Sequence, residues 1–398
     1  MRTFHCSHCQ HLVFFESVAC VNCGYALAVL PDTLNMAAVR PVDTPAADGP
    51  TSPPADDSAL WEVVRGDPPA APDGPLRYRL CANHALHDAC NFAVAESDGP
   101  LCVSCRQTRT LPDLAVPDNL RRWRLAEDAK RRLYYELARM RLEPIPGEAG
   151  AQFDFLADIP GQPPVMTGHA NGVITLNVAE ADDGERTQRR VALGEPYRTL
   201  LGHLRHESGH YYWDVLILRG GQLEAFRQVF GDEQQDYAQA LQAYYANGPR
   251  ADWSDEFVSA YATAHPWEDW AETWAHYLHM VDLLETAASY GTEVTTPGLD
   301  GALRTRAIDP FGEPAPDFDA MLQRWVPLTL LLNSLTRSLG HPDAYPFAVS
   351  NPVVAKLRFV HDVIRATPAR VAQAAAPVPA IPTPKRKKSS KVPTPAKR

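Results

Sequence analysis

The distribution of cysteine is the strongest constraint on how this chain can fold. All eight cysteines of the 398-residue sequence lie within its first 105 residues. They form two groups of four, Cys6-x2-Cys9-x10-Cys20-x2-Cys23 and Cys81-x8-Cys90-x11-Cys102-x2-Cys105. A Cys-x2-Cys pair places two thiolates on one tight turn, and two such pairs complete a tetrahedral zinc site without an open position. We therefore expect two structural Zn²⁺ sites, because a small segment poor in large apolar residues needs metal to fold.

The two groups differ in how clearly their spacing indicates zinc. The first has the spacing of a zinc ribbon and predicts a module over residues 1–35. The second predicts a module over residues 76–110, but its first two cysteines are widely spaced, and His84 or His87 could replace one of them. Zinc ribbons bind nucleic acid or protein, and a ribbon alone does not indicate which.

Proline and charge divide the rest of the chain. Residues 41–75 hold nine prolines, which predicts an extended linker over residues 36–75. Residues 366–398 hold eight Lys or Arg and no acidic residue, which predicts a disordered basic tail after a main domain over residues 111–365. Such a tail either tethers the protein to nucleic acid or an acidic partner, or is simply solvated.

The overall charge and hydropathy exclude two classes of function. The net charge is −10, and without the tail the remaining 30 basic and 48 acidic residues give −18. This acidic body argues against broad coating of nucleic acid by the whole chain. The sequence shows neither a secretory leader nor an apolar run of the ~20 residues that cross a membrane. We therefore expect a cytoplasmic protein without membrane contact, in which reduced cysteines bind metal rather than form disulfides.

A second set of metal-binding residue types lies in the middle of the chain, in the pattern His206-Glu207-x-x-His210. On a helix, residues four apart share one face, so both imidazoles can reach the same metal. Glu207 would then lie where it can take a proton from a water molecule at the metal. The periodicity predicts a helix from Pro196 to about Arg219, after two strands at Gln152–Ala157 and Val173–Val178.

A catalytic zinc site also needs a third protein ligand. Pro266 begins a predicted helix over residues 266–289 in which Glu268 and Glu272 share a face. One of these carboxylates can bind the metal while the other holds a ligand histidine through its free ring N–H. His276 and His279, further along this helix, are weaker candidates.

Residues 1–300 resemble a bacterial family of zinc-binding metallopeptidases with an N-terminal zinc-ribbon region. The matching stretches are Cys81-Ala-Asn, Leu101–Cys105, Phe153–Asp158, Gly172–Asp182, Gly194–His203, His206–Trp213 and His265–His279. The resemblance implies an α+β fold, with a mainly helical, zincin-like peptidase domain that has a small β-sheet and follows the zinc-ribbon modules.

The helix that contains Glu268 is also similar to one in the anthrax lethal factor group of gluzincins. That similarity implies that Glu268 is the third ligand and that Glu272 supports the site. A tyrosine seven residues before the ligand glutamate assists the transition state in that group, and Tyr261 has this spacing. Ser208 departs from the pattern, because a bulky apolar residue is commoner there.

Together these features predict a zinc-dependent metallopeptidase. His206, His210 and Glu268 would hold the catalytic Zn²⁺, with Glu207 as the base and Tyr261 as the oxyanion donor. Strand Val173–Val178 is predicted to be the sheet edge that pairs with an extended peptide or protein substrate. The alternative is a non-catalytic zinc-ribbon scaffold with a degenerate protease fold, which an intact Glu207 and a third ligand argue against.

Overall fold

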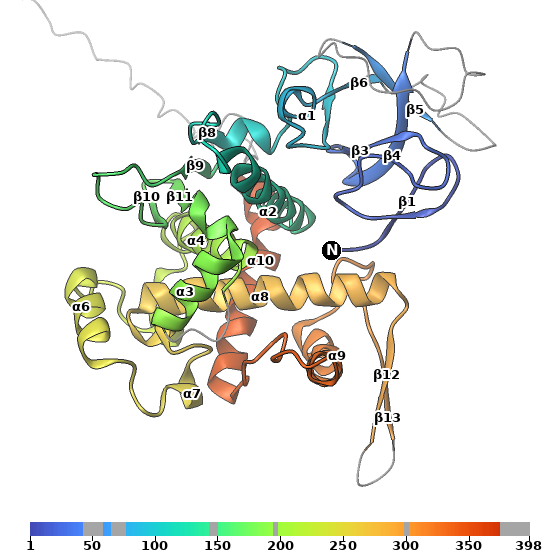
Figure 1. The fold of residues 1–398 in the computed structure, drawn as a ribbon. Helices are drawn as coiled ribbons and strands as arrows, with labels where there is room; N and C mark the ends of the chain where they lie inside the picture. The colour runs from blue at the N-terminus through green and yellow to red at the C-terminus, as the bar shows by residue number, and fades with distance from the viewer. Residues whose placement is uncertain (43–58, 65–76, 143–149, 194–197, 298–301, 375–398) are drawn as a thin grey trace, which may run out of the picture.

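The computed structural model describes residues 1–42, 59–64, 77–142, 150–193, 198–297 and 302–374, and the fold mixes helices and sheets (Figure 1). The N-terminal region forms a small sheet beside a mainly helical body. The long helix α8 (Pro266–Ser289) runs across this body. Within the described ranges, no helix is long and apolar enough to cross a membrane.

The N-terminal region is built around a five-stranded antiparallel sheet with its strands in chain order. The strands are β3 (Ala26–Leu30), β4 (Asn35–Pro41), β5 (Trp61–Val64), β6 (Arg77–Leu80) and β7 (Ala93–Ala95). The N–H of Val29 donates to the carbonyl of Asn91 at 2.8 Å, so the end of the sheet returns toward its first strand. A short hairpin of β1 (Phe4–His5) and β2 (Leu12–Val13) precedes the sheet.

This sheet corrects the prediction of a linker over residues 36–75. Residues 36–41 of that range belong to strand β4, which buries Met36–Val39, and strand β5 buries Trp61. Most of the prolines that suggested a linker lie in 43–58 and 65–76, which are outside the described residues. The apolar segments between them complete a sheet that joins the two predicted zinc modules into one unit.

The body contains a second sheet in the order β10-β11-β9-β8. Its strands are β8 (Thr108–Thr110), β9 (Gln152–Leu156), β10 (Gly168–Ala170) and β11 (Val173–Asn177). Strands β8, β9 and β11 are parallel, whereas β10 is antiparallel to β11.

The prediction that Val173–Val178 forms the sheet edge was therefore wrong. Strand β11 is internal, and β10 forms the edge beside it. Asn171 and Gly172 have φ values of 51° and 78°, as a two-residue hairpin turn requires, and this turn folds β10 back onto β11.

Three helices form the centre of the body: α2 (Asn119–Arg139), α4 (Leu200–Tyr212) and α8. Helix α4 begins where the Thr199 hydroxyl accepts a hydrogen bond from the N–H of Gly202. At the start of α8, His265 accepts from the N–H of Trp267, and Pro266 occupies the first turn. Helices α4 and α8 approach closely at Gly209, where a Cβ atom would lie 2.9 Å from the Cα of Ala271.

The remaining elements surround this centre. They are α1 (Ala82–His87), α3 (Asp183–Leu193), α5 (Leu223–Phe230), α6 (Tyr237–Asn247), α7 (Trp253–Glu256), the hairpin β12 (Glu293–Thr296) and β13 (Leu303–Arg306), α9 (Phe318–Ser338) and α10 (Asn351–Ala374). Helix α4 continues into a π-helical turn, Trp213–Leu218. Helix α10 extends into the predicted tail as far as Ala374, and residues 375–398 lie outside the described part.

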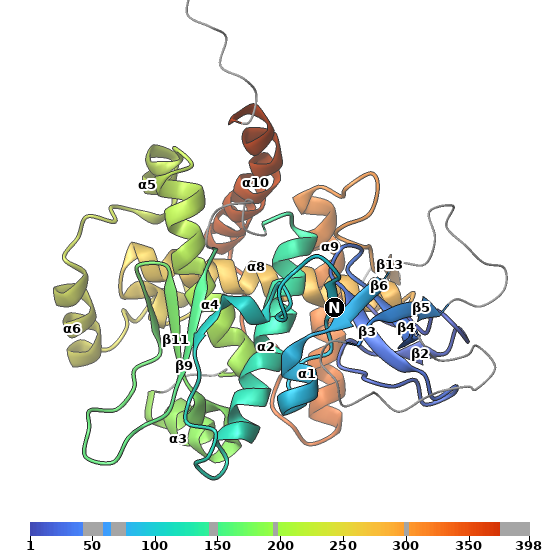
Figure 2. The same cartoon turned by 90° about the horizontal axis from the view of Figure 1, so that it is seen from above.

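The N-terminal region and the body are in direct contact at α8. The backbone N–H groups of Arg2 and Thr3 donate to Glu285 and Ser289, at 3.2 and 3.0 Å. Tyr135 of α2 packs into the apolar core that surrounds the cysteines, and its hydroxyl donates to Glu285 at 2.8 Å. Figure 2 shows the same arrangement from above, with α2 between the five-stranded sheet and α4.

Candidate metal centres and active site

The structure brings the four cysteines of each predicted group together. In each group the four sulfur atoms lie within 4.8 Å of one another. The measured Sγ–Sγ distances are 3.7 Å for Cys6 and Cys23, 3.6 Å for Cys9 and Cys20, and 3.7 Å for Cys90 and Cys102. Tetrahedral zinc with Zn–S bonds of about 2.3 Å separates its sulfurs by about 3.8 Å, so both groups fit zinc.

The histidines near the second group are not among the candidate ligands. His84 lies 2.9 Å from the carbonyl of Cys90 through its Nδ1 atom. The ring of His87 packs edge-on against Trp123. All four cysteines of this group are buried, so the second group forms a closed site without a histidine.

A third candidate centre lies between helices α4 and α8. His206 and His210 project from α4, and Glu268 projects from the first turn of α8. The Oε2 atom of Glu268 lies 3.0 Å from Nε2 of His206 and 3.4 Å from Nε2 of His210. The HExxH helix and the second helix thus bring together the three residues that the sequence predicts as catalytic zinc ligands.

The chemistry of this group fits a metal ion. Oε2 of Glu268 is buried and makes no hydrogen bond of good geometry with any described residue. Zinc with bonds of about 2.0–2.1 Å to nitrogen and oxygen places tetrahedral ligands about 3.4 Å apart. Glu268 Oε2 lies at about this distance from both imidazole nitrogens. A zinc ion bound to all three atoms would therefore fit here and would give the buried oxygen a partner.

Glu272 holds His206 from the other side of its ring. Oε1 of Glu272 lies 2.6 Å from Nδ1 of His206, which leaves Nε2 of the ring directed at Glu268. The hydroxyl of Ser259 donates to Oε2 of Glu272 at 2.5 Å. Both carboxylates predicted on α8 are therefore present at the site, with Glu268 toward the metal position and Glu272 behind the histidine.

Glu207 and two tyrosines lie close to these candidate ligands. The Glu207 side chain is buried beside His206. Burial raises the pKa of the Tyr237 and Tyr261 hydroxyls, and the negative charges of Glu268 and Glu207 raise it further. Both phenols are therefore neutral hydrogen-bond donors close to the two carboxylates.

Tyr261 lies in a short 3₁₀ turn (Tyr261–Thr263) shortly before α8. Its ring centre is 6.0 Å from that of His206. The sequence did not predict Tyr237, whose hydroxyl donates to Oε1 of Glu268 at 2.6 Å. The two oxygens of Glu268 therefore face different groups, Oε1 facing a phenol and Oε2 the two histidines.

Two aromatic side chains pack beside His210. The ring of Trp267 is centred 3.9 Å from that of His210. His169, on the edge strand β10, lies 6.2 Å from His210 between ring centres. The Asn171-Gly172 turn was the sequence signal that could have located this strand, and it brings the edge of the sheet to the candidate ligands.

The other histidines of this region have partners of their own. Nδ1 of His203 lies 2.6 Å from Glu180. Burial alone would raise the pKa of Glu180, but His203 and Arg198 lower it to about 2. His276 and His279, the weaker ligand candidates, contact the hydroxyl of Tyr345 and the guanidinium of Arg205 respectively.

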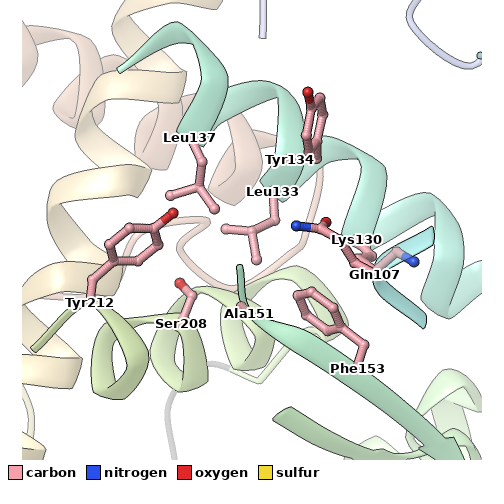
Figure 3. Close-up of a pocket in the computed structure, with 9 residues that line it drawn as sticks. All are labelled: Gln107, Lys130, Leu133, Tyr134, Leu137, Ala151, Phe153, Ser208 and Tyr212. Atoms are coloured by element: carbon pink, nitrogen blue, oxygen red, sulfur yellow. The ribbon is translucent and has the colours of Figure 1, made fainter. Parts of the chain in front are cut away.

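Two hydrogen bonds explain how α4 accommodates Ser208, at a position where a bulky apolar residue is commoner. Its hydroxyl donates to the carbonyl of Arg205 at 2.7 Å and accepts from the indole N–H of Trp274 at 3.1 Å. A small cavity of about 20 Å³ lies on this side of the helix, between α2, α4 and β9 (Figure 3). This volume holds about one water molecule, so the cavity is not a substrate site.

Comparison with known proteins identifies the family. A family model described as "Putative zinc-binding metallo-peptidase" matches residues 119–363. The chain belongs to this metallopeptidase family. A zinc-ribbon domain model matches residues 3–116 of this family member, a range that includes both cysteine groups and the five-stranded sheet.

Relatives of this metallopeptidase family member occur in mycobacteria. Uncharacterized proteins of Mycobacterium tuberculosis and Mycobacterium bovis are 40% identical to it over 372 residues, which is 92% of this chain and 95% of theirs. No solved structure matches the chain.

Proposed function

We propose that this protein is a zinc-dependent peptidase that hydrolyses peptide bonds at the site formed by His206, His210 and Glu268. The observation that carries the proposal is the convergence of two imidazole nitrogens on the buried Oε2 of Glu268, which accepts no hydrogen bond of good geometry from a described residue. Three protein ligands leave one position for water or substrate, which distinguishes a catalytic zinc site from the closed cysteine sites. The two cysteine groups are then structural Zn²⁺ sites.

The roles of the protein groups follow from their positions. Zinc at this site would make a water molecule more acidic and polarise the carbonyl of the substrate. Glu207, next to His206, takes the proton of the attacking water and passes it to the leaving amine. The Tyr261 hydroxyl donates to the carbonyl oxygen as that oxygen gains negative charge. Glu272 and Ser259 keep the ring of His206 in place.

We further propose that the substrate binds in an extended conformation along strand β10. This strand is the edge of the described sheet nearest the site, because its His169 lies beside His210. An edge strand can pair with a peptide backbone whatever the peptide's side chains are. Such pairing would position the scissile bond without requiring one particular sequence.

Metal analysis combined with peptide-library cleavage tests this proposal. Wild-type protein should contain about three zinc ions per chain, one in each candidate centre. Alanine in place of His206, His210 or Glu268 should remove one of them, because two remaining ligands bind zinc far more weakly. Glu207→Gln should keep all three and abolish cleavage, because Glu207 acts as a base and not as a ligand.

The matched control is Glu224→Gln, which makes the same change at an exposed position on α5. It should retain both zinc content and activity. Equal cleavage by the wild type and Glu207→Gln would mean that the activity comes from a contaminant, and would favour the non-catalytic zinc scaffold.

A further inference from the structure

Helix α6 contacts the candidate active site but has no buried residue of its own. None of its eleven residues, all of them described, is buried. Gly231 and Gly248 lie before and after the helix with φ values of 102° and 73°, a region that glycine enters readily. Both views show α6 at the outer edge of the molecule, beyond the start of α8 (Figures 1 and 2). An exposed helix between two such glycines has few contacts to oppose its movement.

Aromatic contacts hold α6 to the body at the end of α8 that carries the candidate ligand Glu268. The ring of Tyr237 packs edge-on against His265 and Trp267, with ring centres 5.3 and 5.7 Å apart. The ring of Tyr244 packs edge-on against Tyr261 at 5.7 Å. Helix α6 therefore rests on residues next to the candidate ligands and on the predicted oxyanion donor.

One polar contact links α6 directly to a candidate ligand. The Tyr237 hydroxyl donates to Oε1 of Glu268 at 2.6 Å, while Oε2 of the same carboxylate faces His206 and His210. A carboxylate can bind a metal through one oxygen or through both. A strong hydrogen bond to Oε1 favours binding through Oε2 alone. This leaves a coordination position for the water and the substrate carbonyl.

We propose that α6 is a lid over the candidate active site, and that Tyr237 is a positioning residue that links lid closure to one-oxygen binding of zinc by Glu268. The inference rests on the proposed zinc site. When α6 moves away, substrate can enter and Glu268 loses its hydroxyl partner. When α6 closes, Tyr237 restores the ligand geometry that leaves room for the reaction. Catalysis is thereby coupled to closure of the helix.

The first test measures the metal geometry without measuring activity. Full-length wild type, Tyr237→Phe and Tyr290→Phe are loaded with Co²⁺, and visible absorption is recorded. The spectrum of His206→Ala, which retains only the cysteine sites, is subtracted from each. Tyr237→Phe should show weaker and shifted d–d bands, because a second oxygen of Glu268 raises the coordination number. Tyr290→Phe removes a hydroxyl from an exposed tyrosine at the far end of α8 and should match the wild type.

The outcomes separate the two proposals. An unchanged difference spectrum in Tyr237→Phe overturns the positioning role. An unchanged spectrum in Glu268→Ala means that Glu268 is not a ligand, and overturns the proposed zinc site together with the inference. With a peptide substrate, Tyr237→Phe should lower kcat about 10-fold or more while KM changes little, because the metal is retained but its geometry is altered.

The second test measures the lid itself by amide hydrogen exchange. Amides of residues 237–247 should exchange much faster than those of α8 in the wild type. Tyr237→Ala should accelerate them further, because it removes the ring contacts as well as the hydroxyl, whereas Tyr237→Phe retains the ring contacts. Exchange in α6 as slow as in the centre of α8 would show that the helix does not open, and would overturn the lid.

Discussion

At the scale of single residues, His206 is the most constrained group of the candidate site. One of its ring nitrogens faces Glu268 and the other faces Glu272. An imidazole binds a metal through one of its two nitrogens. Because Glu272 contacts Nδ1, the nitrogen that remains for a metal is Nε2. The site therefore depends on a glutamate that does not itself touch the metal position.

Loss of this support should weaken zinc binding without abolishing it. We expect Glu272→Ala to lower the zinc affinity of the catalytic site about 10- to 100-fold, as is typical for residues that orient a ligand. Ser259→Ala should have a smaller effect in the same direction, because it removes one hydrogen bond from Glu272. Competition with a chromophoric chelator measures both. An affinity unchanged in Glu272→Ala would contradict the orienting role.

Tyr261 provides a second prediction at this scale. Tyr261→Phe should retain full zinc content and lower kcat by roughly 100-fold, because it removes a donor to the developing oxyanion but no ligand. Metal analysis and steady-state kinetics on one peptide substrate test both parts. A variant that lost zinc would indicate that the hydroxyl is needed to hold the site together, because phenylalanine retains the ring that packs against His206.

The sequence predicts some residues of the site better than others for a physical reason. His206 and His210, four residues apart on one helix, reveal each other by spacing, as do Glu268 and Glu272. Tyr237, Ser259 and His169 lie on separate elements and reach the site only through tertiary packing. No local pattern in the sequence marks Tyr237 or Ser259, and the Asn171-Gly172 turn locates the strand of His169 without showing that it reaches the site.

At the scale of elements, the distance between α4 and α8 sets the geometry of the candidate zinc site, because the ligands come from both helices. Gly209 allows these helices to meet, since its missing side chain leaves room for the backbone of Ala271. Any residue with a Cβ atom there must push the helices apart. The glycine beside His210 is therefore a packing requirement of the site.

We expect Gly209→Ala to destabilise the protein by about 1–3 kcal/mol, the usual cost of an overpacked contact. It should also weaken zinc binding, because it moves His210 away from Glu268. Thermal unfolding and metal titration measure the two effects. Gly184→Ala is the control, since a Cβ at this helical glycine meets open space and should not lower the stability. A fully stable Gly209→Ala would show that the helices can separate at no cost.

Binding of substrate along β10 can be tested through the substrate backbone. A series of peptides, each with one N-methylated amide, should show raised KM values at alternate positions, because a peptide paired with a strand edge directs every second N–H toward it. Side-chain substitutions at the same positions serve as the comparison. Equal effects at adjacent positions would argue against strand pairing.

Elements with strong end signals were predicted well. The prediction of α8 over residues 266–289 was confirmed, since Pro266 and His265 define its start. Residues 222–246 show the pattern of a single helix but form two, because the segment containing Gly231 separates α5 from α6. Strand β10 has only three residues, too few to show the alternation that predicts strands.

At the scale of the whole molecule, the N-terminal region behaves as one structural unit. A single apolar core includes residues of both cysteine groups and Tyr135 of α2. Strands β3 to β7, which lie in the sequence between the first cysteine group and the end of the second, pair with one another in one sheet. No recognisable motif marks these strands. The sequence predicted both zinc sites from local spacing, but the pairing of distant strands has no comparable signal, so the modules were predicted as separate.

Because the two cysteine groups share one core, we expect removal of the metal from one group to affect the other. A strong chelator should release the two cysteine-bound zinc ions in one transition, together with loss of protease resistance over residues 3–116, because each site holds part of the same core. Zinc release and limited proteolysis, followed over the same time course, measure the coupling. Two well-separated steps would show that the sites fold independently.

The contact between the start of the chain and α8 also has a consequence for protein synthesis. Arg2 and its partner Glu285 are separated by 283 residues. At about 5–20 residues per second, a ribosome needs roughly 15 to 60 seconds to translate that distance. During this time the nascent zinc-ribbon region exposes the surface that will later cover α8. Its early stability must therefore come from metal and from its own core, and docking onto the peptidase body follows as a late step of biogenesis.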